Sequence, residues 1–513
     1  MKSWLSETMG SLDSPHGSEI PRQARDDRTM NSHYTKKELK KKSENISDWY
    51  TEVVVKAELA DYAPVKGTMV IRPYGYSLWE RVQEIMNRYM KAEGVENAYF
   101  PMFIPYSLLE KEKEHVKGFS PELAIVTVGG GEKLKDPLVV RPTSETIMYE
   151  MYKKWVHSWR DLPILINQWN NVIRWEKRTY LFLRTMEFLW QEGHTAHATE
   201  NEVLELIRRT LDWYKTIYEE YYGIPVVVGV KSASEKFAGA KATFTVELLM
   251  PDGKALQGAT SHNLGQNFSR VFDIKFQSKE SKEEFVWQTS WAITTRSLGA
   301  LVLVHGDDQG LVLPPNMAPT QVIIMPIRKV DKENEKLDVY AQEVKEVLFN
   351  GGIRAKIDSR DEPSVGRRFN EWEVKGIPVR FEIGHKEALD NTVTLVRRDT
   401  GEKTIVKRSD MLVTVEKVLQ TMQKDLFAKA KTFRDENTHD VNTYDEFKKI
   451  MSTTRGFIRA FWCEDAVCET AIKEETKAST RCLPLEDMHK FSDGECIKCG
   501  KKSTHKWLFA QAY

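Results

Sequence analysis

Apolar residues recur at helical spacing in several parts of the chain. In SLWERVQEIMNRYMKAEG, which starts at Ser77, the pattern predicts an amphipathic helix, and Gly94 is placed to end it. A second helix is expected in SETIMYEMYKKWVHSW, with Thr143 or Ser144 as N-cap, and a third over 199–221. Short β-like runs, NAYFPMFIP, LAIVTV and LVVRP, lie between the first two. This mixture favours an α+β fold.

The stretch FLRTMEFLWQEGHTAH, residues 182–197, is predicted to be one extended strand. The preceding NNVIRWE reads as its partner strand, with KRTYL as a short turn between them. Alternate residues of a strand share a face, and the even-numbered face here is neither apolar like a core nor uniformly polar like a surface. We expect it to be the wall of a binding site, formed by Arg184, Met186, Phe188, Trp190, Glu192 and His194.

The pattern changes beyond the proline-rich GLVLPPNMAP. QVIIMPI is a continuous apolar run, as in a strand buried on both faces, and KLDVYAQEVKEVLFNGG reads as a helix with a glycine stop. IRAKIDS, PVRFEIG and TVTLVRR read as further strands, with the helix FNEWEVKG between the first two, which indicates a small α/β domain. The predicted divisions are a polar, disordered leader over 1–45 and domains over 46–316, 317–425 and 426–513.

Composition narrows the class of protein. The chain has 513 residues, of which 41% are hydrophobic and 29% charged, and a formal net charge of zero, so overall charge does not indicate a nucleic-acid partner. No apolar run is long enough for a membrane helix, and we expect no membrane partner. The first 30 residues contain the acidic Glu7, Asp13, Glu19, Asp26 and Asp27 and fit a transit peptide poorly, which favours a cytoplasmic location over an organellar one. The end of the leader, TKKELKKKSE, is either the solvated start of a helix or a contact for RNA phosphates.

All five cysteines lie in the last 51 residues. Cys463-x₄-Cys468 and Cys496-x₂-Cys499 are spaced like the two halves of a four-thiolate zinc site. Four thiolates leave no open position, so such a zinc ion would be structural. The alternative is a set of free buried thiols, and Cys482 stands outside the pairing.

Three further stretches offer polar side chains close to strand ends. Each has an ordinary interpretation: helix capping, a surface charge pair or a loop histidine. Together with the 182–197 face they suit a ligand with a phosphate, an ammonium and a small apolar ring, because arginine forks bind phosphate and carboxylates bind ammonium. An aminoacyl adenylate is such a ligand. The residues are Thr143 and Glu145 in VVRPTSE, Arg174 and Glu176 in NVIRWE, and Gln257, Thr260 and His262 in KALQGATSHNLGQNFS.

From about Trp49 to Tyr513 the chain resembles the class II aminoacyl-tRNA synthetases, and among them the prolyl-tRNA synthetases of the archaeal/eukaryotic-like type. GTMVIRPYGYSLWERV is similar to the first class motif, with Pro73 at its dimer-interface position. VIRWE and FLRTMEFLWQEGHTAH are similar to the second, and SWAITTRSLGA with HGDDQGLVLPP to the third. The resemblance implies an antiparallel-sheet catalytic domain, an α/β anticodon-binding domain and a small α/β zinc-binding C-terminal domain.

The same resemblance implies the reaction and its partners. A homodimer would attach L-proline to tRNA(Pro) with ATP and Mg²⁺, through a prolyl-adenylate. Positioning and charge neutralisation carry such a reaction, so no protein nucleophile is expected, and the family's catalytic residues are Arg174 and Arg296. The implied ATP site is Arg174, Glu176, Arg184, Gln257, Thr260, Thr294 and Arg296. The implied proline site is Thr143, Glu145, Arg174, Phe188, Trp190, Glu192, His194 and His262.

Some positions depart from the family pattern. Ala292 stands in WAITTR where glycine is usual, and Arg367 and Arg368 stand near a usual lysine of the anticodon domain. Some relatives carry an editing insertion between motifs 2 and 3, but the interval from Glu192 to Gln257 is too short to hold one, so no cis-editing domain is expected.

Three other classes of protein fit the sequence less well. Threonyl-tRNA synthetase needs a cysteine ligand in its core, and none precedes Cys463. A catalytically inactive, tRNA-binding paralogue would lose ATP-site arginines, yet Arg174, Arg184 and Arg296 are present. A zinc-ribbon nucleic-acid module on an unrelated core would not explain the density of adenylate-site residues.

Overall fold

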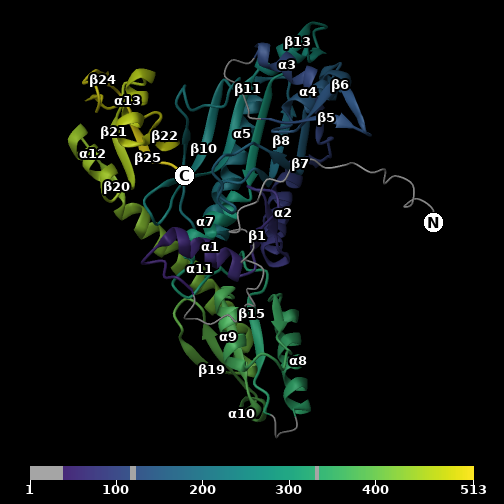
Figure 1. Cartoon of the computed structure of the whole chain (residues 1–513), viewed down its shortest axis with the longest axis vertical. Coiled ribbons are helices and arrows are strands. Elements are labelled where there is room, and N and C mark those ends of the chain that lie inside the picture. Colours follow the sequence, from purple (N-terminus) through teal and green to yellow (C-terminus); the bar gives the residue numbers. More distant parts are fainter. Residues whose placement is uncertain (1–38, 116–122, 330–333) are drawn as a thin grey trace, which may run out of the picture.

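The computed structural model describes residues 39–115, 123–329 and 334–513 (Figure 1). Most of the predicted leader lies outside these ranges. Within its described end, Lys42 Nζ donates to the carbonyl oxygens of Leu303 and Gly306, at 2.6 and 2.7 Å. These carbonyls lie at the C-terminal end of helix α7 (Arg296–His305). Lys42, from the basic run of the leader, therefore caps a helix within the protein.

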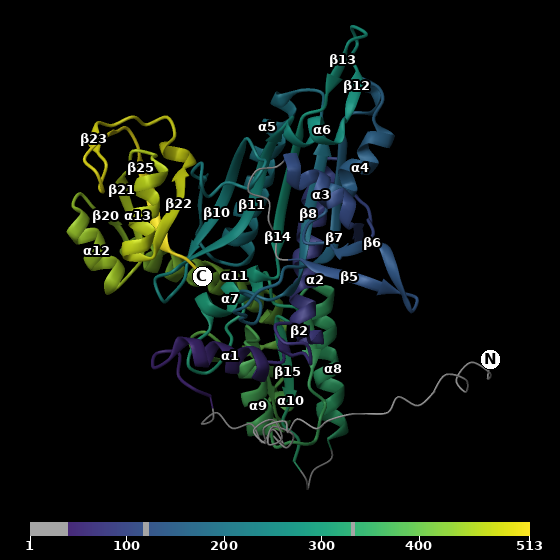
Figure 2. The same ribbon diagram turned by 45° about the horizontal axis from the view of Figure 1, so that its top comes forward.

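One large sheet of eleven strands, counted over the described residues, organises the molecule (Figures 1 and 2). Its order is β20-β21-β25-β22-β9-β10-β11-β14-β8-β7-β3, and every pairing from β22 to β7 is antiparallel. The predicted antiparallel catalytic sheet is therefore present. Its catalytic strands are β3 (Glu96–Asn97), β7 (Ile164–Ile173), β8 (Glu187–Ala196), β9 (Val227–Val230), β10 (Ala242–Leu249), β11 (Ala255–Gly265) and β14 (Gln288–Thr294).

Helix α5 (Glu200–Thr216) packs across strands β10, β11 and β14 and begins at a capping box formed by Thr199 and Glu202. A π-helical turn, Ile217–Tyr221, continues it, so the predicted helix over 199–221 changes its winding near the end. None of the described helices combines the length and apolar character needed to cross a membrane. The other helices of this part are α1 (Ile46–Lys56), α2 (Pro73–Ala92), α3 (Tyr106–His115), α4 (Glu145–Trp155), α6 (Asn267–Phe272) and α7 (Arg296–His305).

Three smaller sheets belong to the same part of the chain. Two are hairpins, β1 (Ala60–Tyr62) with β2 (Met69–Ile71) and β12 (Lys275–Gln277) with β13 (Glu283–Phe285). The third has the order β4-β6-β5 and consists of β4 (Phe103–Pro105), β5 (Ala124–Gly129) and β6 (Glu132–Val140).

The prediction of one strand over 182–197 is wrong at its start, because β8 begins only at Glu187. Arg184 and Tyr180 exchange backbone hydrogen bonds at 2.6 and 2.9 Å, which closes a tight turn before the strand. Phe182, inside that turn, has a left-handed φ of 60°, and its side chain is buried in the main core. The connection between β7 and β8 is therefore longer than KRTYL, and it removes Arg184 and Met186 from the strand face.

The predicted α/β domain has a five-stranded sheet of order β16-β15-β17-β18-β19, within the described residues. Every residue of β15 is buried, as QVIIMPI predicted, and β15 pairs in parallel with both β16 and β17. The elements are β15 (Val322–Pro326), α8 (Glu335–Asn350), β16 (Ala355–Ile357), α9 (Val365–Val374), β17 (Val379–Ile383), α10 (His385–Asp390), β18 (Thr392–Arg397) and β19 (Lys403–Lys407).

Helix α11 (Met411–Glu436) runs without a break across the predicted division at 425. It leads to a C-terminal unit whose strand β22 pairs with β9, so this unit extends the catalytic sheet (Figure 2). The unit contains β20 (Thr438–Asp440), α12 (Tyr444–Ser452), β21 (Phe457–Phe461), α13 (Ala466–Thr476), β22 (Ala478–Pro484), β23 (Gly494–Glu495), β24 (Lys502–Ser503) and β25 (Lys506–Gln511).

Candidate active site

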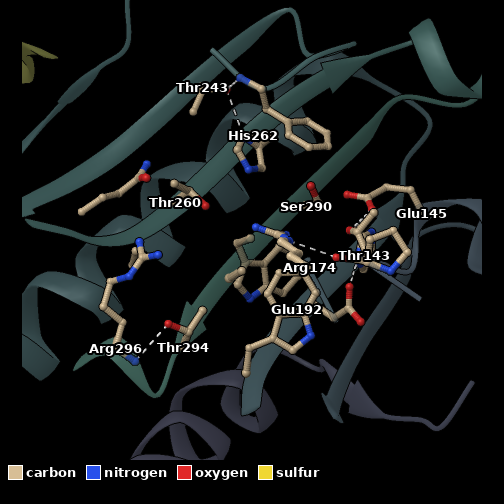
Figure 3. Close-up of a pocket in the computed structure, with 18 of the residues that line it drawn as sticks. Thr143, Glu145, Arg174, Glu192, Thr243, Thr260, His262, Ser290, Thr294 and Arg296 are labelled. Carbon is tan, nitrogen blue, oxygen red and sulfur yellow. Dashed lines mark hydrogen bonds and ion pairs between the residues drawn. The ribbon is translucent and has the colours of Figure 1, made fainter. Parts of the chain in front are cut away.

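A cavity of about 480 Å³ opens over strands β8, β11 and β14 (Figure 3). Alternate residues of β8 point into it, as the period of a strand requires. Most of the residues that the sequence predicts for the site line this cavity: Thr143, Glu145, Arg174, Phe188, Trp190, Glu192, His194, Gln257, Thr260, His262, Thr294 and Arg296.

Glu192 is the most heavily hydrogen-bonded carboxylate of the cavity. Its side chain is 1% exposed and accepts from Asn170 Nδ2 at 2.6 Å and from Gln168 Nε2 at 3.2 Å. The Ser144 hydroxyl also donates to it. A buried carboxylate needs such donors to remain charged. Ser144 is the N-cap residue of α4, one of the two predicted, but its hydroxyl makes no capping hydrogen bond and donates to Glu192 instead.

The two pocket histidines have opposite protonation preferences. Burial disfavours the charged form of His194, but the Glu145 carboxylate and the hydrogen bond to Glu192 outweigh it and raise the pKa of His194. Burial lowers the pKa of His262 to about 3, and the positive charges of His194 and Arg174 add to this effect. His262 is therefore a neutral ring that contacts Thr243 Oγ1 through Nδ1 at 2.9 Å.

Two arginines supply positive charge to the cavity, Arg174 beside the aromatic wall and Arg296 farther from the carboxylates (Figure 3). Arg174 lies beneath the rings of Phe188 and Trp190, 5.5 and 5.4 Å from their centroids, and Nε donates to Pro142 O at 3.2 Å. Arg296 Nε donates to Leu183 O at 2.9 Å. Neither guanidinium forms an ion pair within the described part of the chain, so both are available to an anionic ligand.

Two predicted residues, Glu176 and Arg184, do not line the cavity. They pair with each other in the connection between β7 and β8, with Arg184 Nε and Nη2 at 2.8 and 2.7 Å from Glu176 Oε2. The Arg184 side chain is half exposed. The prediction that NNVIRWE is a strand is wrong beyond Ile173, where β7 ends, so Arg174 and Glu176 do not share a strand face.

Several lining residues were not predicted from the sequence. Ser290 lies on β14 opposite His194 and His262, and its buried hydroxyl has no hydrogen-bond partner among the described residues. It is four positions before Thr294, so the strand period that predicts one also indicates the other. The remaining ones are Pro142, Glu235, Phe237, Ala238, Thr243, Gly258, Ala259, Trp291 and Ala292.

Ala292, the departure in the third motif, faces the cavity on β14 and pairs in register with Glu192 and Thr260. The strand is continuous through this position, so the extra methyl is accommodated without a bulge.

The cysteine cluster lies at the far end of the C-terminal unit. Sγ atoms of Cys463, Cys468, Cys496 and Cys499 all lie within 4.8 Å of one another, and Cys463 and Cys499 are 3.8 Å apart. Tetrahedral Zn–S bonds of about 2.3 Å place sulfurs about 3.8 Å apart. A backbone hydrogen bond from Lys501 lowers the pKa of Cys499 to about 7, which favours a thiolate. The four residues fit a structural zinc ion.

The two arginines of the α/β domain differ in accessibility. Arg368 is 2% exposed and donates to Asp358 O at 3.1 Å, so it belongs to the interior of the domain. Arg367 is partly exposed and pairs with Glu371 on the same helix at 3.4 Å. Of the two, Arg367 is the one that can face a ligand.

Three family models match the chain in succession. The class II core domain of the tRNA synthetases for G, H, P, S and T matches residues 127–305, and an anticodon-binding domain matches 321–418. The C-terminal domain of prolyl-tRNA synthetase matches 444–513.

Relatives that match over almost their whole length belong to the same family as the C-terminal model. A proline–tRNA ligase of Natranaerobius thermophilus is 50% identical over 93% of this chain and 98% of its own. That of Chlorobium chlorochromatii is 52% identical over 92% and 98%. A crystal structure of Cryptosporidium parvum prolyl-tRNA synthetase with halofuginone and AMPPNP has a TM-score of 0.88 and 42% identity, and covers 92% of this chain and 99% of its own. Another, with L-proline and AMP, has a TM-score of 0.88 and 40% identity, and covers 94% and 99%. By sequence and by fold, the chain belongs to the prolyl-tRNA synthetases, the class II ligases that charge tRNA with proline.

Proposed function

We propose that the cavity forms prolyl-adenylate from L-proline and ATP and then transfers proline to tRNA(Pro). The distribution of charge carries this proposal: carboxylates and a ring-lined wall lie at one end, Arg174 stands against that wall, and Arg296 lies at the other end (Figure 3). One molecule, a prolyl-adenylate, has an ammonium, an apolar ring and a phosphate in that order. The relative from Cryptosporidium parvum with L-proline and AMP supports the same pair of ligands.

Glu145 and Glu192 would bind the two N–H groups of the proline ammonium, with Thr143 orienting Glu145 through the hydrogen bond between them. The proline ring would lie among aromatic and imidazole faces, because a saturated ring without polar atoms is best held by apolar contact. The wall consists of Phe188, Trp190, His194 and His262.

Arg174 would contact the proline carboxylate and the α-phosphate, and Arg296 the remaining phosphates. The carboxylate oxygen attacks the α-phosphorus in line, the bond to the bridging oxygen breaks, and pyrophosphate leaves. Fixed guanidinium groups neutralise charge that develops on the phosphate oxygens, which lowers the barrier without a protein nucleophile. Gln257, Thr260 and Thr294 line the same region and complete the ATP site.

Glu176 and Arg184 would join the ATP site from the connection before β8. Arg184 is half exposed and paired only with Glu176, so a modest turn of its side chain would bring the guanidinium to a phosphate. Mg²⁺, when bound, would neutralise negative charge on the phosphates.

In the second step a terminal hydroxyl of tRNA attacks the adenylate carbonyl and releases AMP. Residues 317–425, with the anticodon-binding domain, would hold the other end of the tRNA. We place the catalytic steps in 46–316, and the structural zinc in 426–513. We also propose a cytoplasmic location.

A homodimer is proposed because apolar side chains are exposed beside Pro73, the first residue of α2. Tyr62, Val65 and Val70 are 62%, 59% and 51% exposed, which is costly for a monomer. A mass of about 119 kDa by light scattering, twice the 59.4 kDa of the chain, is expected, and a mass of one chain would contradict it.

We also propose that the chain does not hydrolyse Ala-tRNA(Pro). Every residue from 197 to 287 is described, and these residues form α5, strands of the catalytic sheet, α6 and the β12–β13 hairpin. None of these described residues forms a separate domain that could serve for editing. Hydrolysis of Ala-tRNA(Pro) by the purified protein would contradict this.

Pyrophosphate exchange into ATP tests the central proposal, with each of the twenty amino acids offered in turn. Exchange with proline, and weaker exchange with the smaller alanine, is expected, because missing methylenes cost only about 1–3 kcal/mol. Exchange with no amino acid, by a protein that still binds ATP, would overturn it.

A further inference from the structure

The segment 231–241 joins β9 to β10 and carries Phe237 over the cavity. The Phe237 ring lies 4.7 Å from the ring of His262, and its N–H donates to Thr243 Oγ1 at 2.9 Å. Thr243 Oγ1 is in turn 2.9 Å from His262 Nδ1. The position of this segment therefore sets how far the Phe237 ring extends over the apolar end of the cavity.

The first half of the segment is held from outside the catalytic domain. Glu469, on helix α13 of the C-terminal unit, accepts hydrogen bonds from the hydroxyls of Ser232, at 2.9 Å, and of Ser234. Thr480 on β22 donates to the same carboxylate. Glu469 is 4% exposed, and a buried carboxylate so supplied with donors fixes the groups that donate to it.

Two further contacts tie the same segment to the C-terminal unit. Lys473, one turn after Glu469, lies 3.1 Å from Glu235, which lines the cavity. Lys231 shares the buried Glu247 carboxylate with Arg481 of β22, each at 2.8 Å. Strands β9 and β22 also approach each other closely, since a Cβ at Gly229 of β9 would lie 2.5 Å from Leu483 O of β22.

We propose that Glu469 is a positioning residue for the cavity: it holds the segment 231–241 so that Phe237 covers the amino-acid end. The C-terminal unit thus sets the affinity for proline and the discrimination against a smaller amino acid. Among the described residues Glu469 is hydrogen-bonded to Ser232, Ser234 and Thr480, none of which belongs to the proposed ATP site, so we expect ATP binding to be unaffected. This inference rests on the proposed proline pocket.

A purely structural role for Glu469 is the competing explanation. A carboxylate that only joins two units would affect stability, and its loss would lower activity with all substrates alike. A positioning role instead changes KM for proline more than kcat or KM for ATP, because only binding at the covered end is weakened.

The test compares Glu469→Gln with Ser234→Ala, which removes one donor from the segment side, and with Glu474→Gln, an exposed residue of the same helix. Pyrophosphate exchange gives kcat and KM for proline, alanine and ATP, and thermal unfolding gives stability. We expect KM for proline to rise about tenfold in Glu469→Gln, because the segment then loses a hydrogen bond to a charged group. Ser234→Ala should show a smaller rise of the same kind, with KM for ATP unchanged within about twofold, and proline/alanine selectivity should fall in both.

Unchanged KM for proline and selectivity in a folded Glu469→Gln protein would overturn the inference, as would a proportional loss with all three substrates. Should Glu469→Gln fail to fold, Ser234→Ala decides alone, since an exposed loop hydroxyl can be removed without opening the core. Absence of proline exchange in the unaltered protein would instead reject the proposed function.

Discussion

Glu192 and His194 lie two residues apart on the cavity face of β8, with His194 Nε2 3.0 Å from Glu192 Oε2. Both side chains are 1% exposed. Burial disfavours the charged form of His194, but the Glu145 carboxylate and the hydrogen bond to Glu192 outweigh it and raise its pKa. Both carboxylates line the end of the cavity where we place the proline ammonium.

Glu192→Gln should weaken proline binding strongly. The change removes a negative charge facing the ammonium and leaves His194 without its partner. Loss of a charge-assisted hydrogen bond of about 2 kcal/mol predicts a decrease of about thirtyfold in kcat/KM for proline. Exchange kinetics at saturating ATP measure it, and KM for ATP serves as the internal control. A decrease below threefold would show that Glu192 does not face the ammonium.

Ser290→Ala should reduce affinity without reducing stability. The hydroxyl is buried at the cavity wall and has no hydrogen-bond partner in the described chain, so its removal leaves no protein group unsatisfied. We expect KM for proline to rise about fivefold, because one neutral hydrogen bond to the ligand is lost. The melting temperature should stay the same or rise. A lower melting temperature with unaltered KM would assign Ser290 to the fold.

Ala292→Gly should lower stability slightly and leave the ATP reaction nearly unchanged. The alanine lies in a continuous strand, where glycine costs about 0.5–1 kcal/mol in conformational entropy. The methyl faces the cavity but causes no register shift at that position. KM for ATP should change by less than about twofold. A gain of tenfold or more on substitution would show that Ala292 obstructs the adenine.

The sequence predicts the wall of the cavity from Phe188 to His194 because a regular strand repeats its face every two residues. It places Arg184 wrongly on that face, because the Tyr180–Arg184 turn and the left-handed Phe182 interrupt the strand pattern. Contacts between distant residues are equally invisible to a local pattern. Ser232 and Glu469 are 237 positions apart, and nothing near either one indicates the other. Helix α11 runs through the predicted division at 425, and helical spacing carries no information on which unit a turn packs against.

Acid should destabilise the protein partly through His305. Burial lowers its pKa to about 4, whereas the unfolded value is about 6.5. Between these pH values the unfolded chain binds a proton that the folded chain does not, so stability falls as the pH falls. At pH 5 the contribution is about 2 kcal/mol. His305→Gln keeps a donor near Tyr222 O and should show a smaller decrease in melting temperature between pH 7 and pH 5. The exposed His489→Gln should behave like the unaltered protein, and identical decreases in all three would exclude His305 as a source.

Metal removal should loosen the C-terminal unit. Cys463 precedes α13, Cys468 lies in the first turn of that helix, and Cys496 and Cys499 lie in the turn between β23 and β24, so a zinc ion would cross-link these segments. Purified protein should hold about one zinc ion per chain by elemental analysis. Chelation or Cys499→Ser should lower the melting temperature, because binding to the folded state alone stabilises it. Cys482→Ala is the matched control, since Cys482 is buried outside the cluster and should leave the metal content unchanged. Protein without metal and with an unaltered melting temperature would show that the four thiols pack as free cysteines.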